Sequence, residues 1–215
     1  MRKFNMAART RDLVQGQADM AVGDNVNLSF SVDYAWDRYT KSSVGLTSAE
    51  SLSLGTDMSL ALTDDTRLHA YLQADRIDSR QAGVETTTSG WWTARGLDET
   101  QVAGLGVRHV ALKGKLEVGA DLTVSRSWSD MRVTAGSASG FPIARSAFEG
   151  LKVTAAWKLQ ENVSVVGSYW YEFQRSTDWH LDGVTPSTVP TLLALGDQAP
   201  RYRINLLRVA LRYRF

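Results

Sequence analysis

The sequence predicts an all-β fold, an antiparallel transmembrane β-barrel of the outer-membrane type with about eight to nine strands, and three observations support this. Apolar and polar side chains alternate with a period of two over long stretches. Short polar turns and long polar loops alternate between those stretches. Aromatic side chains recur near the ends of the apolar faces. This combination is typical of strands that present one face to lipid and the other to a polar interior.

The clearest strand runs from Val26 to Asp37, where the period of two is kept for twelve residues. Its apolar face carries Val26, Leu28, Phe30, Val32, Tyr34 and Trp36. Strands of soluble proteins are usually about 5–6 residues long, whereas a tilted membrane-spanning strand needs ~9–11. The length therefore favours a membrane barrel over a soluble β-sandwich, in which half-buried strands also alternate.

In chain order we expect a weak first strand around residues 14–22 and then eight stronger ones. These occupy residues 26–37, 52–62, 68–74, 103–107, 116–125, 151–159, 163–173 and 207–215. Short turns are predicted at 23–25, 63–65, 113–114 and 160–162, and long loops at 40–49, 79–98, 130–147 and 178–201. Short turns at one end and long loops at the other indicate periplasmic turns and extracellular loops.

Aromatic side chains are expected to form girdles at the two membrane boundaries, because Tyr and Trp prefer the interface. The predicted girdle residues are Tyr34, Trp36, Trp128, Trp157, Tyr171 and Phe173. The opposite faces carry charged residues that we expect to line the lumen: Asp33, Asp37, Asp57, Asp121, Lys152, Lys158, Glu172, Arg208, Arg212 and Arg214. For any one of them, cross-strand pairing on a polar wall is a simpler interpretation than a dedicated functional role.

Composition argues against several classes of function. The 24 Lys and Arg residues against 23 Asp and Glu leave no broad basic surface for nucleic acid. The absence of cysteine removes disulfides, thiolate metal sites and covalent c-type haem attachment. His69, His109 and His180 are scattered without ligand spacing, and DWHLDGV at 178–184 lacks the spacing of a calcium loop. We therefore expect no catalytic residues, no metal and no cofactor in these residues.

The number of strands indicates whether these residues form a whole barrel or part of one. The first residues lack the apolar core of a signal peptide, and residues 1–10 are expected to form a poorly ordered leader. With short turns in the periplasm, nine strands place the N-terminus outside, whereas a complete bacterial barrel has an even number. We infer that residues 1–215 form one segment, the C-terminal portion of a larger porin-like barrel. The alternative is an eight-stranded barrel preceded by a leader at 14–22.

The last nine residues, LRVALRYRF, alternate up to the terminal aromatic residue. Leu211, Tyr213 and Phe215 fall on the apolar face, and the arginines fall on the other. This ending resembles the C-terminal assembly signal of outer-membrane barrels. The barrel insertion machinery and outer-membrane lipid are accordingly expected partners.

Two segments carry a more particular resemblance: DRYTKSSVGLTSAESLSLGTDMSLALTDDTRLHAYLQADRIDSRQAG at 37–83 and STDWHLDGVTPSTVPTLLALGDQAPRYRINLLRVALRYRF at 176–215. They resemble the decahaem-associated outer-membrane barrel family of the MtrB/PioB type, over nearly the whole chain. The most particular parts are D-W-x-L-D-G-V at 178–184, L-x-L-G at 193–196 and P-x-Y at 200–202. The resemblance implies a barrel of well over twenty strands that sheathes a periplasmic multihaem c-type cytochrome, with the haem carried by that partner.

The leading hypothesis is therefore a sheath for electron transfer across the outer membrane. The alternative is a stand-alone small outer-membrane porin or channel for solutes. An autotransporter translocator would need a helix ahead of the first strand, and residues 1–12 are too short and too weakly amphipathic for one. An outer-membrane hydrolase is disfavoured, because no G-x-S-x-G elbow or comparable motif occurs.

Overall fold

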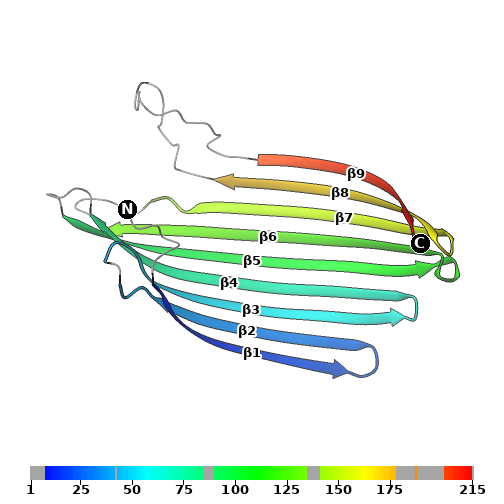
Figure 1. Ribbon diagram of the computed structural model, residues 1–215, viewed down its shortest axis with the longest axis horizontal. Coiled ribbons are helices and arrows are strands. Elements are labelled where there is room, and N and C mark those ends of the chain that lie inside the picture. The colour runs from blue at the N-terminus through cyan, green and yellow to red at the C-terminus, as the bar shows by residue number, and fades with distance from the viewer. Residues whose placement is uncertain are drawn as a thin grey trace.

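The computed structural model describes residues 8–41, 43–84, 90–134, 141–177, 187 and 201–214. Nine strands form one antiparallel sheet in which each strand pairs with its neighbours in sequence. They are β1 (Thr10–Val22), β2 (Val26–Arg38), β3 (Gly45–Thr63), β4 (Thr66–Val84), β5 (Trp91–Ala111), β6 (Leu116–Thr134), β7 (Ala144–Gln160), β8 (Val163–Thr177) and β9 (Arg201–Tyr213). They lie side by side in one layer with β1 and β9 at its edges (Figure 1). Within the described residues β1 and β9 do not pair, so the sheet is open.

The all-β prediction is confirmed, and the weak first strand is a full one. β1 pairs with β2 without interruption from Thr10 opposite Arg38 to Val22 opposite Val26. The alternative of eight strands with a leader at 14–22 is therefore wrong for this chain. Residues 1–7 lie outside the described residues, and β1 already begins at Thr10.

The predicted short turns are present at one end of the sheet, but three of the predicted long loops are too long. At least half of each of the ranges 40–49, 79–98 and 130–147 belongs to strands, because β3 begins at Gly45, β4 ends at Val84 and β5 begins at Trp91. Likewise β6 continues to Thr134 and β7 begins at Ala144. In these stretches charged residues such as Asp78, Arg95 and Arg132 occupy outward positions, so the hydrophobic alternation is interrupted although backbone pairing continues. Only the loop predicted at 178–201 agrees with the strand ends.

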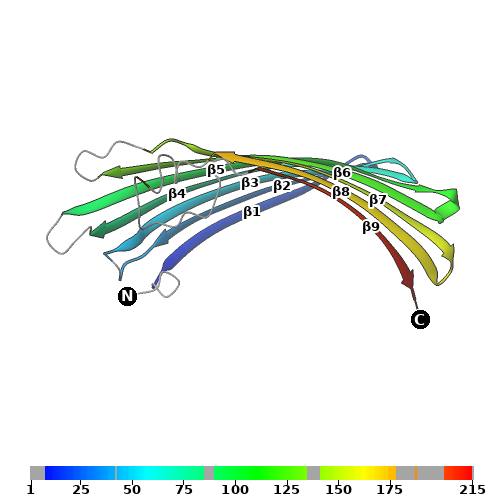
Figure 2. The same ribbon diagram turned by 90° about the horizontal axis from the view of Figure 1, so that it is seen from above.

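The sheet is twisted and bowed. The start of β1 and the end of β9 bend to the same side of it (Figure 2). Packing of the glycines indicates that the polar face is the concave one. A methyl group on Gly104 would overlap the Tyr71 ring, and one on Gly106 would overlap the side chains of His69 and Asp121. On the apolar face, a methyl group on Gly167 would have no heavy atom nearer than a carbonyl oxygen at 4.0 Å. Side chains converge on the inner side of a closing sheet, which matches this difference.

The apolar face is broadly exposed, as expected for a surface covered by lipid. Large apolar side chains on it include Phe30, Leu72 and Leu105, which are 47%, 59% and 55% exposed. The buried apolar residues among those described are small: Ala35, Ala94 and Ala147. The sheet therefore has no compact core of its own, and its apolar area is available to the bilayer.

The upper limit of the apolar face runs diagonally across the strands. Towards the loop end, the first charged residue on this face is Glu50 in β3 and Glu149 in β7. The hydrogen-bonded row through Glu149 meets β3 at Thr56, six residues from Glu50. At ~3.3 Å per residue and ~4.8 Å between strands, an offset of six residues over the four intervals from β3 to β7 corresponds to a tilt of about 45°. That is the tilt of strands in outer-membrane barrels.

The strands are longer than a membrane requires. β5 has 21 residues, which at this tilt rise by roughly 50 Å along the membrane normal. The apolar band of an outer-membrane barrel is only ~25 Å tall. The loop ends of the central strands therefore extend beyond the hydrocarbon layer, and their outward faces carry paired charges instead of apolar side chains. No helix in the described part of the chain is long and apolar enough to cross a membrane.

Candidate functional site: the polar concave wall

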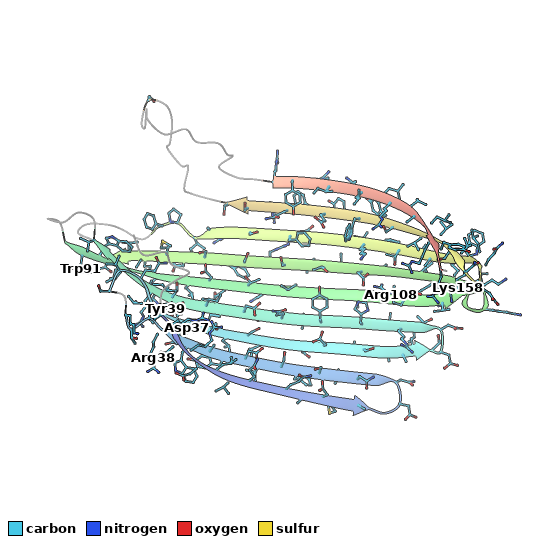
Figure 3. All side chains as sticks on the ribbon, in the orientation of Figure 1. Asp37, Arg38, Tyr39, Trp91, Arg108 and Lys158 are labelled. Carbon is cyan, nitrogen blue, oxygen red and sulfur yellow. The ribbon has the colours of Figure 1, made fainter. Side chains whose placement is uncertain are left out.

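The predicted lumen residues all fall on the concave face. Register places Asp33 opposite Ser53, Asp121 opposite Lys152 and Arg208 opposite Ser168. The same alternation assigns to this face Asp37, Asp57, Lys158, Glu172, Arg212 and Arg214. Figure 3 shows that the wall runs the length of the sheet, with Asp37 at the loop end and Arg108 and Lys158 near the turn end. The charged side chains thus share one surface and do not gather in one pocket.

Strands β1 to β4 form an acidic part of this wall. It carries five carboxylates, Asp19, Asp33, Asp37, Asp57 and Asp75, against three cations, Arg11, Arg67 and, directly before β1, Arg9. Several carboxylates are held by neutral amides: Gln15 Nε2 donates to Asp33 at 2.7 Å and Gln73 Nε2 donates to Asp75 at 2.9 Å. Because an amide satisfies the oxygen without cancelling its charge, this part of the wall remains negative.

At the loop end, Asp37 differs from these carboxylates, because its partner is a charged arginine and not a neutral amide. Its side chain is 7% exposed, and Arg11 donates to both of its oxygens, at 2.7 and 2.8 Å. Arg9 lies 3.6 Å away and adds a second positive charge. A bidentate arginine fork of this kind fixes both partners in geometry as well as charge. The pair therefore ties β1 to β2 at the end of the wall.

On the middle strands β4 to β6, towards the turn end, the wall contains a cluster of mixed charge. Asp121 accepts from Arg108 Nη2 at 2.9 Å and lies 3.1 Å from His69 Nε2. Tyr71 Oη lies 3.1 Å from Thr123 Oγ1 in the neighbouring part of the same face. These residues line an open cleft of about 390 Å³, which also reaches β7 and β8. The cleft is open along the concave face and is not an enclosed pocket.

Strands β7 to β9 form a basic part of the wall. On these strands it carries the four cations Lys152, Lys158, Arg208 and Arg212, with Arg214 directly after β9, against the single carboxylate Glu172. Lys152 Nζ lies 5.0 Å from the centre of the Trp170 ring, a cation–π contact. Among the described residues, none of these five cations forms an ion pair with a carboxylate. The wall is thus divided into a negative and a positive part.

The predicted girdle residues all lie on the opposite, apolar face. Tyr34 and Trp36 pack with their ring centres 5.4 Å apart, and Trp157 is 52% exposed. Register assigns Trp128, Tyr171 and Phe173 to the same face. Of the predicted assembly signal, Leu211 and Tyr213 point outward with 71% and 53% exposure. Phe215 lies outside the described residues, as do the motifs at 178–184 and 193–196.

Three groups of residues were missed by reasoning from sequence. The first is a group of charged residues on the concave face: Asp19, Asp75, Arg67 and Arg108. They lie in β1, β4 and β5, where hydrophobic alternation predicts only part of each strand. The second is a short apolar patch on the concave side of β9, formed by Tyr202, Ile204 and Leu206. The third is the set of outward arginines and carboxylates at the loop ends. Continuing the period of two through the polar stretches, without requiring hydrophobicity, would have found all three.

No group of three or more His, Asp or Glu side chains suited to hold a metal ion occurs among the described residues. The chain also has no cysteine. The wall offers charged and hydrogen-bonding groups spread over a broad surface, which suits contact with a large polar occupant or with water.

Comparison with known proteins agrees with this geometry. A relative from Shewanella baltica, "Outer membrane protein MtrB", is 25% identical over 215 residues, which is all of this chain and 31% of that protein. The chain therefore spans about a third of the relative's length, in agreement with the prediction that it is a portion of a larger barrel. The family match, to outer-membrane β-barrel porins of the MtrB/PioB type, covers residues 1–215.

Solved structures agree on the fold alone, because their sequence identity to this chain is low. The copper transporter OprC superposes with a TM-score of 0.73 at 10% identity, over 96% of this chain and 34% of its own. The alcaligin receptor FauA from Bordetella pertussis gives 0.65 at 14% identity, over 96% and 33%. Both align to this open sheet with about a third of their own length. With a family match along its entire length, this chain belongs to the MtrB/PioB family of outer-membrane β-barrel porins and resides in the bacterial outer membrane.

Proposed function

We propose that this chain is part of an outer-membrane sheath that holds a periplasmic multihaem c-type cytochrome, so that electrons cross the outer membrane inside the barrel. The chain itself binds no haem in this proposal. The cofactors belong to the partner, in keeping with the absence of cysteine here. The observation that carries the proposal is the division of charge on the concave wall.

A solute channel and a sheath place different demands on such a wall. Water and small solutes need a polar surface of any arrangement. A folded protein presents a fixed pattern of charge, which a complementary pattern can orient and retain. Under this proposal the cytochrome turns an acidic surface toward β7 to β9 and a basic surface toward β1 to β4. Exposed apolar residues on the same wall, Trp170, Ile204 and Leu206, give it contact area that a water-filled channel does not need.

The test is retention of haem protein by the full-length barrel that carries this sequence, co-expressed with a periplasmic multihaem cytochrome. Wild type should co-purify with haem-staining protein. Arg208→Gln combined with Arg212→Gln removes two charges from the basic part of the wall and should lower retention, most strongly at raised salt. The matched control is Arg76→Gln combined with Arg132→Gln, two arginines on the outward face, which should retain haem protein as wild type does.

The alternative of a stand-alone channel is favoured by the family description of these proteins as porins. It predicts ion conductance from the barrel in planar bilayers and no retained haem protein under any salt condition. A stable barrel that conducts ions and never co-purifies with a multihaem cytochrome would overturn the sheath. Equal loss of haem protein in the lumen variant and in the outward control would remove the argument from wall charge.

A further inference from the structure

The outward face at the loop end of β7 to β9 carries four arginines: Arg145, Arg175, Arg201 and Arg203. We propose that this β7–β9 arginine cluster is a binding site for a phosphorylated lipid headgroup of the outer leaflet. The inference rests on the outer-membrane location of the chain and not on the proposed sheath.

Two arginines of this cluster face each other directly across the β8–β9 ladder. Arg175 of β8 lies opposite Arg201 of β9. The same row meets β7 at Ala147, and Arg145 lies on the same face two residues nearer the loop end of β7. Like charges directly opposite one another destabilise a sheet. Such an arrangement is tolerated when something else supplies the counter-charge.

In another row of arginines on the same face, carboxylates of the same strands neutralise the positive charge. Arg80, Arg95 and Arg132 also lie opposite one another across β4 to β6. There, however, Arg95 pairs with Asp78, with Nε 3.0 Å from Oδ1, and Arg132 pairs with Asp130 at 3.0 Å. The chain thus places carboxylates beside one arginine row.

In the part of the chain that the structure describes, no such carboxylates lie beside the β7–β9 cluster. Among the described residues, none of its four arginines forms an ion pair. The nearest carboxylate on the face, Glu149, is already paired with Arg126 at 3.1 Å. Arg203 instead lies over the Phe173 ring, with 5.6 Å between the guanidinium carbon and the ring centre. The counter-charge therefore has to come from outside these strands.

The position of the cluster at the upper edge of the apolar face indicates the kind of anion that it binds. Below it on β8 the outward residues are Phe173, Tyr171 and Tyr169. Below it on β9 Asn205, which accepts from Tyr169 Oη at 2.7 Å, is followed by Leu207 and Val209, which are 75% and 70% exposed. The arginines thus lie where the apolar face gives way to polar residues, which is the headgroup level. Arginine forks match phosphate geometry in two-point hydrogen bonds. A ligand with phosphate above and acyl chains below fits this order of side chains.

The test compares lipid binding by the full-length barrel that carries this sequence, purified in detergent. The probe is lipopolysaccharide with intact lipid A phosphates, beside a dephosphorylated preparation and inorganic phosphate alone. Arg175→Gln combined with Arg201→Gln should weaken binding of the intact probe by about fivefold or more for each arginine removed. The control, Arg76→Gln combined with Arg132→Gln, removes two arginines that already have carboxylate partners and should bind nearly as wild type.

Thermal unfolding supplies a readout that a merely structural role would not give. Without phosphorylated lipid, the Arg175→Gln and Arg201→Gln variant should be at least as stable as wild type, because repulsion is removed. Added intact lipopolysaccharide should stabilise wild type and not this variant. The proposal is overturned if the two variants lose binding equally, if dephosphorylated lipid binds as well as intact lipid, or if inorganic phosphate alone competes at equal phosphate concentration.

Discussion

Gly104 and Gly106 on β5 allow the side chains of Tyr71 and His69 on β4 to lie flat on the concave wall. Register places each glycine directly opposite its partner, Gly104 against Tyr71 and Gly106 against His69. A side chain at either glycine would occupy the space of the ring beside it. The polar wall thus depends on small residues as much as on charged ones, because they decide which long side chains can bend across the neighbouring strand.

Gly104→Ala is expected to destabilise the barrel by about 1–3 kcal/mol, as overpacking does. The Tyr71 ring must move, and its hydroxyl then loses the contact with Thr123 at 3.1 Å. Urea unfolding of the refolded full-length barrel measures this cost. Tyr71→Ala in the Gly104→Ala background should recover most of it, because the two residues are in contact and their effects are not additive.

The control for this prediction is Gly167→Ala on the apolar face. Its nearest non-neighbouring heavy atom would be the Ala155 carbonyl oxygen at 4.0 Å. This substitution should therefore change the free energy of unfolding little. Equal losses for Gly104→Ala and Gly167→Ala would mean that a general requirement for glycine, and not the Tyr71 contact, sets the cost.

At the scale of single elements, β9 combines two patterns along one strand. Near its turn end the alternation is regular, with Val209, Leu211 and Tyr213 outward and Arg208 and Arg212 inward. Towards its loop end the pattern reverses: Arg201 and Arg203 face outward, and the apolar residues face the wall. The outward residues of β9 therefore face lipid near the turn end and the headgroup level near the loop end, and its inward residues form part of the wall.

The turn end of β9 gives the prediction for assembly. Tyr213→Ala combined with Phe215→Ala should lower the amount of barrel inserted in the outer membrane several-fold, since the outward aromatic residues of the last strand are the expected recognition feature. Quantifying the heat-modifiable folded form in outer-membrane fractions measures the effect. The control Arg212→Gln changes the other face of the same strand. Normal insertion of the aromatic variant would contradict the assignment of an assembly signal.

The elements also mark how far sequence could predict this structure. Hydrophobic alternation found β2 nearly to the residue, because one face of that strand is apolar from Val26 to Trp36. It failed for the loop end of β4, where Arg76, Asp78 and Arg80 replace apolar residues on the outward face. Backbone pairing continues there because cross-strand ion pairs such as Arg76 with Glu99, at 3.4 Å, replace burial.

Prediction of the wall was limited for a related reason. Alternation assigned Asp33, Asp121 and Arg208 to one face, but which residues meet depends on register between strands. The contact of Asp121 with both Arg108 and His69 joins three strands. The division into acidic and basic parts likewise appears only when strand order places β1 to β4 on one side and β7 to β9 on the other.

At the scale of the whole molecule, the diagonal limit of the apolar face fixes how the sheet sits in the membrane. Thr56 and Glu149 belong to the same hydrogen-bonded row, yet one lies within the apolar face and the other at its upper edge. A row of hydrogen bonds therefore crosses from hydrocarbon to water. This follows directly from strand tilt in a closed barrel.

The absence of cysteine makes this arrangement easy to measure. In the full-length barrel, with any cysteines elsewhere replaced, Glu149→Cys should react with a water-soluble maleimide in intact membranes. Thr56→Cys should not, because lipid covers it. Glu50→Cys, six residues nearer the loop end of β3, should react again. Equal labelling of the cysteines introduced at 56 and 149 would show that the rows lie parallel to the membrane and that the inferred tilt is wrong.

The height of the wall has a consequence for where electrons could leave a sheathed cytochrome. The central strands rise well beyond the hydrocarbon layer, so a protein held inside is surrounded by backbone and side chains far above the lipid surface. Electron tunnelling weakens steeply with distance, and such a wall keeps outside oxidants from approaching sideways. Under the proposed function, an electron acceptor would then have to meet the haem chain at the open end of the wall and not through its side.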